Sequence, residues 1–212
     1  MKDQKRFLVF MNILSAVFSP LYATSWIFLW LFSFTYQRTM PWSYKITIIL
    51  MVFVFTAIIP KFGINVYRKL YQIRHHQIDN REHLHIPYIL SILSFLTCVL
   101  LFVNIHIAGF MRGILYGALI AQIIGALINT RWKISTHMLG MGGLVGAYMA
   151  FSEVLYFNPI IGISTLAILS GMVGSARIIF AKHTLLQIIT GFVLGYVCQY
   201  VCVLLPLLFF TY

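Results

Sequence analysis

Long apolar segments separated by short polar breaks run through almost the whole chain of 212 residues. A helix that crosses a bilayer needs about 20 predominantly apolar residues. Seven segments meet this requirement and predict seven membrane-spanning helices, at residues 7–33, 45–66, 87–105, 108–128, 136–155, 159–178 and 183–210. The weakest break is the short turn at 104–107. Without a turn there, the count falls to six.

Prolines fit these predicted boundaries. Pro41, Pro87 and Pro159 lie at or near breaks, where proline is tolerated. Pro20 lies inside the first segment, and we expect it to kink that helix. The N-terminal segment is similar to a cleavable secretory signal peptide. Its apolar run is longer than a signal requires and no small-residue cleavage site follows, so we interpret it as a membrane span.

Composition agrees with this pattern. Hydrophobic residues make up 61% of the chain and charged residues only 9%, which is more apolar surface than a soluble domain of this size can bury. The longest polar stretch, at about 67–85, is too short to form a core of its own. We therefore expect an all-α, polytopic membrane helical bundle of six to seven spans, in which residues 1–212 form a single integral-membrane domain.

The formal net charge is +11, and its distribution bears on partners and sidedness. No soluble basic domain is available to bind nucleic acid, so the expected partners are the bilayer and an anionic lipid at its surface. With seven spans, one face collects Lys2, Lys5, Arg6, Lys61, Arg68, Lys69, Arg74, Arg81, Arg131, Lys133, Arg177 and Lys182, and the other holds Arg38, Lys45 and Arg112.

The positive-inside rule places the crowded face in the cytoplasm, and we expect a multi-pass protein of a bacterial-type inner membrane. Cations that bind substrate are not topology signals, so the opposite orientation stays open.

Two segments of the crowded face carry the candidate chemistry. The first is NTRWKISTHMLGMGG, residues 129–143, and the second is SARIIFAKHTLLQIITG, residues 175–191. The polar residues of interest are Arg131, Lys133, Ser135, Thr136 and His137 in the first, and Arg177, His183 and Gln187 in the second. Each histidine lies near the start of a predicted helix, with cations a few residues upstream.

Each residue type also has a purely structural explanation. Cations at the ends of spans extend toward lipid head groups, and glycines let helices pack closely. As a set, however, the residues suit a phosphate. Arginine pairs with phosphate through its planar fork of donors, and the N-terminus of a helix binds anions. A neutral imidazole can attack phosphorus while a second one protonates the leaving oxygen. The positive end of a helix dipole favours a neutral His183, which suits a nucleophile.

These segments resemble two signatures of the type 2 phosphatidic acid phosphatase superfamily. Its third signature reads Ser-Arg, five residues, His, three residues, Asp, and the stretch from Ser175 through Arg177 and His183 to Gln187 is similar. Its second signature, Pro-Ser-Gly-His, is similar to KISTH at 133–137. The resemblance covers about residues 129–195 and implies a helical-bundle phosphatase that needs no metal or other cofactor.

The resemblance also implies roles for individual residues. His183 would be the nucleophile that becomes a phosphohistidine, His137 the general acid, and Gln187 the residue that orients His183. Arg177 would bind the phosphate and Ser135 would contribute its hydroxyl. The other expected phosphate-binding residues are Lys133, Thr136, Arg131 and Arg81.

Several positions differ from the family's pattern. Ala176 separates Ser175 from Arg177, Ile134 replaces a proline and Thr136 replaces a glycine. The first signature, Lys, six residues, Arg-Pro, is absent, and Arg81 and Lys69 are candidate stand-ins.

The replacement of the family's aspartate by Gln187 matters most. Residues four apart lie on one helix face, so Gln187 can still accept a hydrogen bond from His183. It lacks the negative charge that stabilises an imidazolium, and losing such a partner costs orders of magnitude in rate in related triads.

The leading hypothesis is a membrane phosphatase or phosphotransferase that acts on a phosphomonoester or diphosphate of a prenyl lipid or glycerolipid. One alternative is a protein that binds or transports an anionic lipid head group without cleaving it. Another is a scaffold whose basic face anchors it to anionic lipid. A metal site among His75, His76, His83 and His85 is a weaker possibility, because their spacing is irregular and no cysteine lies nearby.

Overall fold

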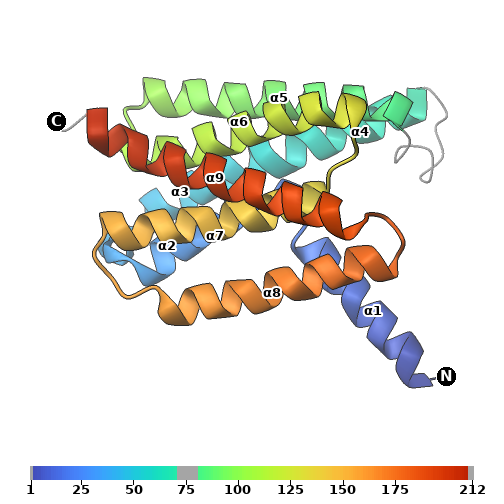
Figure 1. The fold of residues 1–212 in the computed structure, drawn as a ribbon. Helices are drawn as coiled ribbons and strands as arrows, with labels where there is room; N and C mark the ends of the chain where they lie inside the picture. Colours follow the sequence, from blue (N-terminus) through green and yellow to red (C-terminus); the bar gives the residue numbers. More distant parts are fainter. Residues whose placement is uncertain (1, 71–80, 210–212) are drawn as a thin grey trace.

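The computed structural model describes residues 2–70 and 81–209, and the regular elements in these ranges are all helical. The long helices run back and forth beside one another, as predicted for an all-α bundle (Figure 1). In chain order the elements are α1 (Lys2–Val17), α2 (Pro20–Phe34), η1 (Tyr36–Thr39), α3 (Trp42–Phe53), η2 (Val54–Ile58), α4 (Ile59–Leu70), α5 (Arg81–Asn104), α6 (Gly109–Arg131), α7 (Thr136–Val154), α8 (Ile160–Ile179) and α9 (Leu185–Phe209).

Among the described residues, five helical segments are long and apolar enough to cross a membrane. They are Trp42–Leu70, Ile86–Asn104, Gly109–Arg131, Ile160–Ile179 and Leu185–Leu205. The bent pair formed by Lys5–Val17 and Pro20–Phe34 makes six if it counts as one span. All six coincide with predicted segments. The remaining predicted span, α7, forms a helix of 19 residues but is not among these six, so the count of seven is not confirmed.

A proline bends the first apolar segment, as the sequence predicts. Helices α1 and α2 meet at 70°. Ser19 has an extended backbone, and Pro20 opens α2, where its missing N–H is not needed. The indole N–H of Trp26 donates to the carbonyl of Val17 at 3.1 Å. This bond satisfies a carbonyl that the end of α1 leaves without a helical partner, so the corner is held in place.

A second proline accounts for an irregularity in the next span. Pro60 has no N–H to continue the helical ladder, and the preceding residues Val54–Ile58 form a π-helical turn. The hydroxyl of Ser94 on α5 donates to the carbonyl of Phe55 in that turn. A neighbouring helix thus satisfies a backbone group near the proline, and Trp42–Leu70 continues as one span.

The predicted turn between the third and fourth segments is confirmed. Helix α5 ends at Asn104 and α6 begins at Gly109. Between them, His106 has a φ of 52°, in the left-handed region that reverses the chain sharply.

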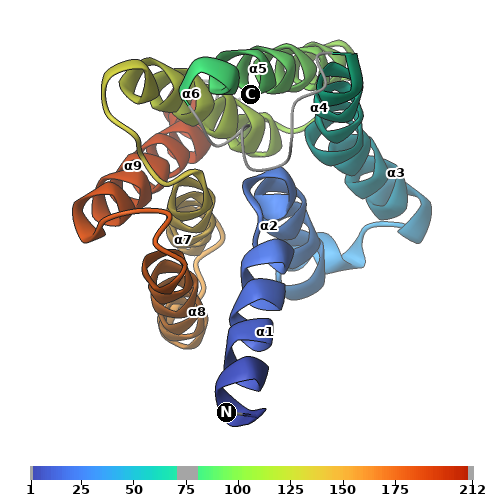
Figure 2. The ribbon, with the colours of Figure 1, turned by 90° about the vertical axis from the view of Figure 1, so that its right-hand side faces the viewer.

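Helix α7 lies at the centre of the bundle, surrounded by α2, α6, α8 and α9 (Figure 2). Its closest partner is α9, and both helices carry glycines four residues apart, Gly142 and Gly146 on α7 and Gly191 and Gly195 on α9. A Cβ atom on Gly142 would lie only 1.9 Å from the carbonyl oxygen of Phe192 on α9. Small residues at this spacing let two backbones approach closely in a membrane, as we expect from the glycine-rich segment.

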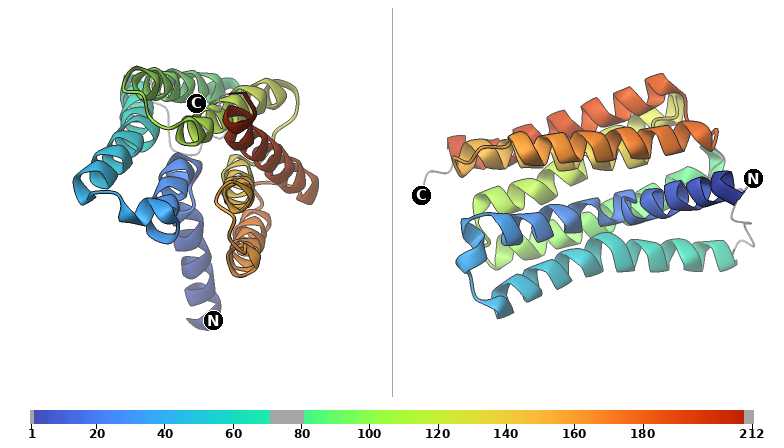
Figure 3. Two further views of the ribbon diagram at one scale, coloured as in Figure 1. Left: turned by 90° about the vertical axis from the view of Figure 1, so that its left-hand side faces the viewer. Right: turned by 90° about the horizontal axis from the view of Figure 1, so that it is seen from below.

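The central position also explains why α7 is not among the strongly apolar segments. Most of its residues are buried against other helices, so its composition reflects close packing with protein rather than contact with lipid. The end-on view in Figure 3 shows the same arrangement, with α1 and α2 lying beside the α7–α8 pair.

Cations gather at one end of the bundle, which we call the basic end. Helices α4, α6 and α8 end there and α7 and α9 begin there (Figure 1). The described cations on these ends, on the connecting loops and on the start of α1 are Lys5, Arg6, Arg68, Lys69, Arg131, Lys133, Arg177 and Lys182, whereas Lys61 lies in the first turn of α4. Arg38, Lys45 and Arg112 belong to elements at the other end. The predicted separation of cations is therefore present in the fold.

Candidate functional site

The segment 132–135 connects α6 to α7 at the basic end and begins with a buried turn. The side-chain oxygen of Asn129 accepts a hydrogen bond from the N–H of Ile134 at 3.3 Å. Ser135 then caps α7, because its hydroxyl oxygen accepts from the N–H of Met138 at 3.4 Å. The Ser135 side chain has no exposed surface. The Ser135 hydroxyl therefore caps α7 in the structure, whereas the resemblance implies that it binds phosphate.

The second segment forms a tight turn between α8 and α9. Ala181 has a φ of 50°, and the N–H of Lys182 donates to the carbonyl of Arg177 at 3.0 Å. Backbone bonds of this kind close the C-terminus of a helix after a left-handed residue. Only His183 and Thr184 separate this turn from α9, which begins at Leu185.

Gln187 caps the start of α9. Its side-chain oxygen accepts a hydrogen bond from the N–H of Thr184 at 3.1 Å. Thr184 precedes Gln187 by three residues, which is the spacing of a capping box, in which a glutamine reaches back to the N-cap N–H. This structural role was missed at the sequence level, although the pattern Thr-Leu-Leu-Gln carries it.

The same oxygen of Gln187 lies 3.3 Å from Nδ1 of His183. Because the bond from Thr184 requires oxygen at this position of the amide, Nδ1 of His183 is the donor. A neutral histidine that carries its proton on Nδ1 has its lone pair on Nε2. The predicted contact between His183 and Gln187 is therefore present, and in a neutral ring it selects the tautomer whose lone pair is on Nε2.

The two predicted segments are in direct contact. The N–H of Ser135 donates to the backbone carbonyl of Gln187 at 3.2 Å. The carbonyl oxygen of Ser135 in turn lies so close to α9 that a Cβ on Gly191 would be 2.6 Å from it. The start of α7 and the start of α9 therefore lie side by side, with their positive dipole ends at the same end of the bundle.

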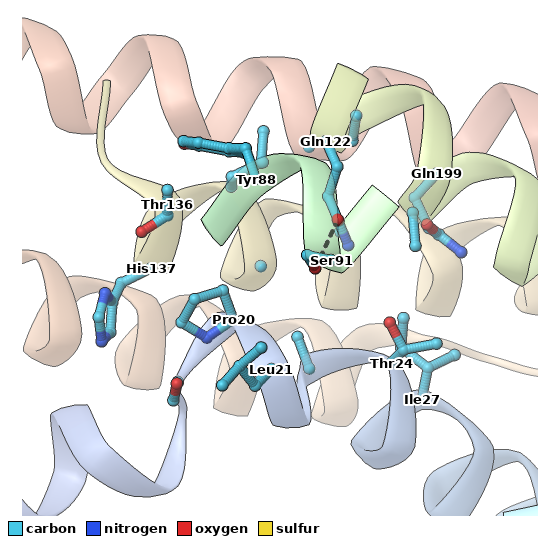
Figure 4. Close-up of a pocket in the computed structure, with 18 of the residues that line it drawn as sticks. Pro20, Leu21, Thr24, Ile27, Tyr88, Ser91, Gln122, Thr136, His137 and Gln199 are labelled. Carbon is cyan, nitrogen blue, oxygen red and sulfur yellow. Dashed lines mark hydrogen bonds between the residues drawn. The ribbon is translucent and has the colours of Figure 1, made fainter. Parts of the chain in front are cut away.

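His137 and Arg177 contact the first two helices. His137 is half-buried in the first turn of α7 and lines a cavity beside Ser19 and Pro20 (Figure 4). Nη1 of Arg177 donates to the hydroxyl of Ser15 on α1 at 3.4 Å. His183 is not among the cavity's lining residues. His137 therefore lies at the cavity beside the corner between α1 and α2, and Arg177 contacts α1. His183 contacts Gln187 at the start of α9, so these contacts do not join the three residues to one another.

The other predicted residues vary in exposure. Thr136 is the first residue of α7 and lines the same cavity as His137. Lys133 is half-buried, whereas Arg131 is exposed at the end of α6. The side chain of Arg81, like those of His75, His76, His83 and His85, lies outside the described residues. Within the described part of the chain, no three His, Cys, Asp or Glu side chains are grouped for a metal ion.

The cavity continues from His137 into the bundle and has a volume of about 450 Å³. It lies between α2, α5, α6, α7 and α9. Most of its wall is apolar, but several polar side chains contribute to it: Thr24, Tyr88, Ser91, Gln122, Thr136, His137 and Gln199 (Figure 4). Sequence analysis did not single out Tyr88, Ser91, Gln122 or Gln199. The available signal was a polar residue in the middle of an apolar span.

Comparisons of the chain with protein-family models, with curated proteins and with solved structures find no match.

Proposed function

We propose that the protein acts on a lipid phosphate at the basic end of the bundle, as a phosphatase or phosphotransferase with His183 as its nucleophile. The observation that carries this proposal is the hydrogen bond between His183 and Gln187. The same oxygen of Gln187 also accepts a hydrogen bond from the N–H of Thr184, so His183 donates from Nδ1. In the neutral ring, Nε2 is then the basic nitrogen. A nucleophilic histidine needs this arrangement of orienting acceptor and neutral ring.

The charge around His183 supports an anionic substrate. Arg177 and Lys182 precede it, at the end of α8 and in the following turn, and Arg131 and Lys133 lie in the segment that contacts Gln187. The N-termini of α7 and α9 add two positive dipole ends at this site. A lipid can keep its tail in the bilayer while its phosphate enters this basic region.

The reaction would proceed in two steps. Nε2 of His183 attacks phosphorus, a P–N bond forms and the P–O bond to the lipid breaks, while His137 donates a proton to the departing oxygen. Water, or an acceptor hydroxyl in a transferase, then attacks phosphorus, breaks the P–N bond and returns its proton to His137. The products are the lipid alcohol and phosphate, and both histidines recover their starting states.

A second candidate function is binding of the same head group without cleavage. The observation that favours it is the neutral side chain of Gln187, which serves as a helix cap and adds no negative charge beside His183. Under this proposal His183 and the surrounding cations bind the phosphate, and the protein carries or retains the lipid.

Phosphate release and lipid binding, measured separately on the detergent-purified protein, test these two proposals. The assay uses a panel of prenyl and glycerolipid phosphates with the wild type and His183→Asn. His106→Asn is a matched control, because His106 is exposed at the other end of the bundle and asparagine tolerates its left-handed backbone.

Release that His183→Asn abolishes and His106→Asn retains supports the phosphatase. Binding that His183→Asn weakens, with no release from the wild type, supports the head-group binder. Neither release nor binding from folded wild-type protein would contradict both proposals.

A further inference from the structure

The cavity beside His137 leads from the candidate site into the interior of the bundle. Figure 4 shows Thr136 and His137 at one end of the cavity and Thr24, Ile27 and Gln199 at the other. His137 is half-buried in the first turn of α7, and it is the proposed general acid. The cavity therefore begins at a residue that the proposed reaction uses and extends away from the basic end.

The cavity reaches well below the membrane surface. On α6 its lining extends to Ala118, and from there to its end at Arg131 the helix rises about 20 Å at 1.5 Å per residue. The hydrocarbon core of a bilayer is about 30 Å thick. A lipid whose phosphate lies at the basic end can therefore place a chain in the cavity, between the helices.

The wall of the cavity suits a hydrocarbon. Among the described residues, no Lys, Arg, Asp or Glu lines it, and most of its surface is apolar. Three polar side chains of the wall take part in hydrogen bonds within the protein. The hydroxyl of Ser91 donates to the side-chain oxygen of Gln122 at 2.9 Å, and the amide nitrogen of Gln199 donates to the carbonyl of Ile114 at 3.0 Å. These bonds do not depend on a ligand.

The proposed reaction places the lipid chain on the side of His137. In a displacement at phosphorus, the attacking atom and the departing oxygen lie roughly in line, on opposite sides of phosphorus. His183 attacks, and it is not among the lining residues of the cavity. His137 protonates the departing oxygen, which is the atom that carries the lipid chain. The chain therefore extends from the side on which the cavity begins.

We propose that this cavity binds the hydrocarbon chain of the substrate, and that the substrate is a lipid phosphate with a single chain. The inference rests on the proposed action on a lipid phosphate. The volume of about 450 Å³ is about 15 times the roughly 30 Å³ that a water molecule occupies in the liquid, and a methylene group is of similar size. One chain of about 15 carbon atoms fits this volume, whereas two acyl chains of that length do not.

Four probes separate the number of chains from the type of chain. The detergent-purified full chain is titrated with farnesyl phosphate, oleoyl lysophosphatidate, dioleoyl phosphatidate and farnesol, and binding is measured by native mass spectrometry and thermal stabilisation. We expect the two single-chain phosphates to bind at least tenfold more tightly than dioleoyl phosphatidate. The tighter of these two identifies the type of chain. Farnesol, which has the chain but no phosphate, should bind more weakly than farnesyl phosphate and compete with it.

Filling the cavity should exclude the chain. Among the described residues, a Cβ on Gly143 meets only the carbonyl oxygen of Gly195, at 4.0 Å, so the backbone of this part of the wall tolerates a side chain. We expect Gly143→Leu to weaken the binding of farnesyl phosphate and of farnesol about tenfold or more, because leucine occupies space that several methylene groups of the chain would fill.

A second variant and a matched control complete the test. Ala118→Leu fills the cavity from α6 and should have a similar effect. Gly171→Leu on α8 is the control, because Gly171 lies outside the lining and no described atom lies within 4 Å of a Cβ there. It should bind every probe as the wild type does.

Equal affinity for oleoyl lysophosphatidate and dioleoyl phosphatidate would overturn the proposal. Wild-type affinity in the folded Gly143→Leu and Ala118→Leu proteins would also overturn it and would place the chain outside the cavity. Phosphate release that persists unchanged in both filled variants contradicts the cavity assignment alone. Single-chain binding that both variants weaken, without any release from the wild type, supports the cavity assignment and contradicts the phosphatase alone.

Discussion

The side-chain oxygen of Gln187 lies 3.3 Å from Nδ1 of His183 and also caps the helix that follows. One amide therefore has two tasks, to begin α9 and to orient the imidazole. The phosphatase signature proposed from the sequence has an aspartate at this position. The amide of Gln187 makes a contact with His183 but carries no negative charge. Substitutions at Gln187 can therefore separate the effect of the contact from the effect of a charge.

We expect Gln187→Glu to raise phosphate release about 10- to 100-fold, because a carboxylate stabilises the imidazolium that develops on His183. Glutamate has the same reach as glutamine and is favourable near a helix N-terminus, so folding should be preserved. The measurement is kcat on the best lipid phosphate, with Gln37→Glu at the other end of the bundle as control. An unchanged kcat in an active enzyme would show that the charge at this position does not limit the reaction.

Gln187→Leu should lower the stability of the detergent-solubilised protein by about 1 kcal/mol. It removes the acceptor for the N–H of Thr184 at the start of α9, and losses of helix caps cost this much. Thermal unfolding of the wild type, Gln187→Leu and Gln187→Glu gives the comparison. The capping assignment fails if the leucine variant is as stable as the glutamate variant.

Arg177 is predicted to bind phosphate, and it also donates to Ser15 on α1. If phosphate binding is its main role, Arg177→Ala lowers kcat/KM for a lipid phosphate about 100-fold, because a buried charge-assisted bond to phosphate is lost. Ser15→Ala should then leave kcat/KM nearly unchanged. Similar losses of stability in both variants, with no loss of lipid binding, would instead show that Arg177 only ties α8 to α1.

The glycines between α7 and α9 should be sensitive to the smallest substitution. We expect Gly142→Ala to destabilise the protein by about 1–3 kcal/mol, because its Cβ would collide with the backbone of Phe192. Gly171→Ala on α8 is the matched control. Nothing lies within 4 Å of a Cβ there, so alanine should be neutral or stabilise the helix by about 0.5–1 kcal/mol. Equal thermal stability of the two variants would contradict the close packing of α7 on α9.

Features with a strong local cause could be predicted from the sequence. Apolar length located the six spans, Pro20 predicted the bend, and the polar residues around Asn104 predicted a turn. The spacing of His183 and Gln187 predicted their contact from helical geometry. The contact is present, but α9 begins only at Leu185, and the contact forms across the cap that Gln187 makes with Thr184.

Features that depend on three-dimensional neighbours could not be predicted in the same way. Ser91 and Gln122 are 31 residues apart in the chain, and only the packing of α5 on α6 brings them together. The bond from Ser135 to Gln187 likewise depends on how closely the glycines allow α7 and α9 to approach. No periodicity in a single segment encodes either contact.

The burial of α7 has a consequence for how the protein is made. Insertion into a bilayer during synthesis depends on the apolar character of each segment as it leaves the ribosome, and α7 is not among the strongly apolar segments. Its glycines pack against α9, and 30 residues separate the end of α7 from the start of α9, as the bounds Thr136–Val154 and Leu185–Phe209 show. Helix α7 must therefore be stabilised in the bilayer first by α6 and α2, and it acquires its closest partner only after α8 and α9 have been translated.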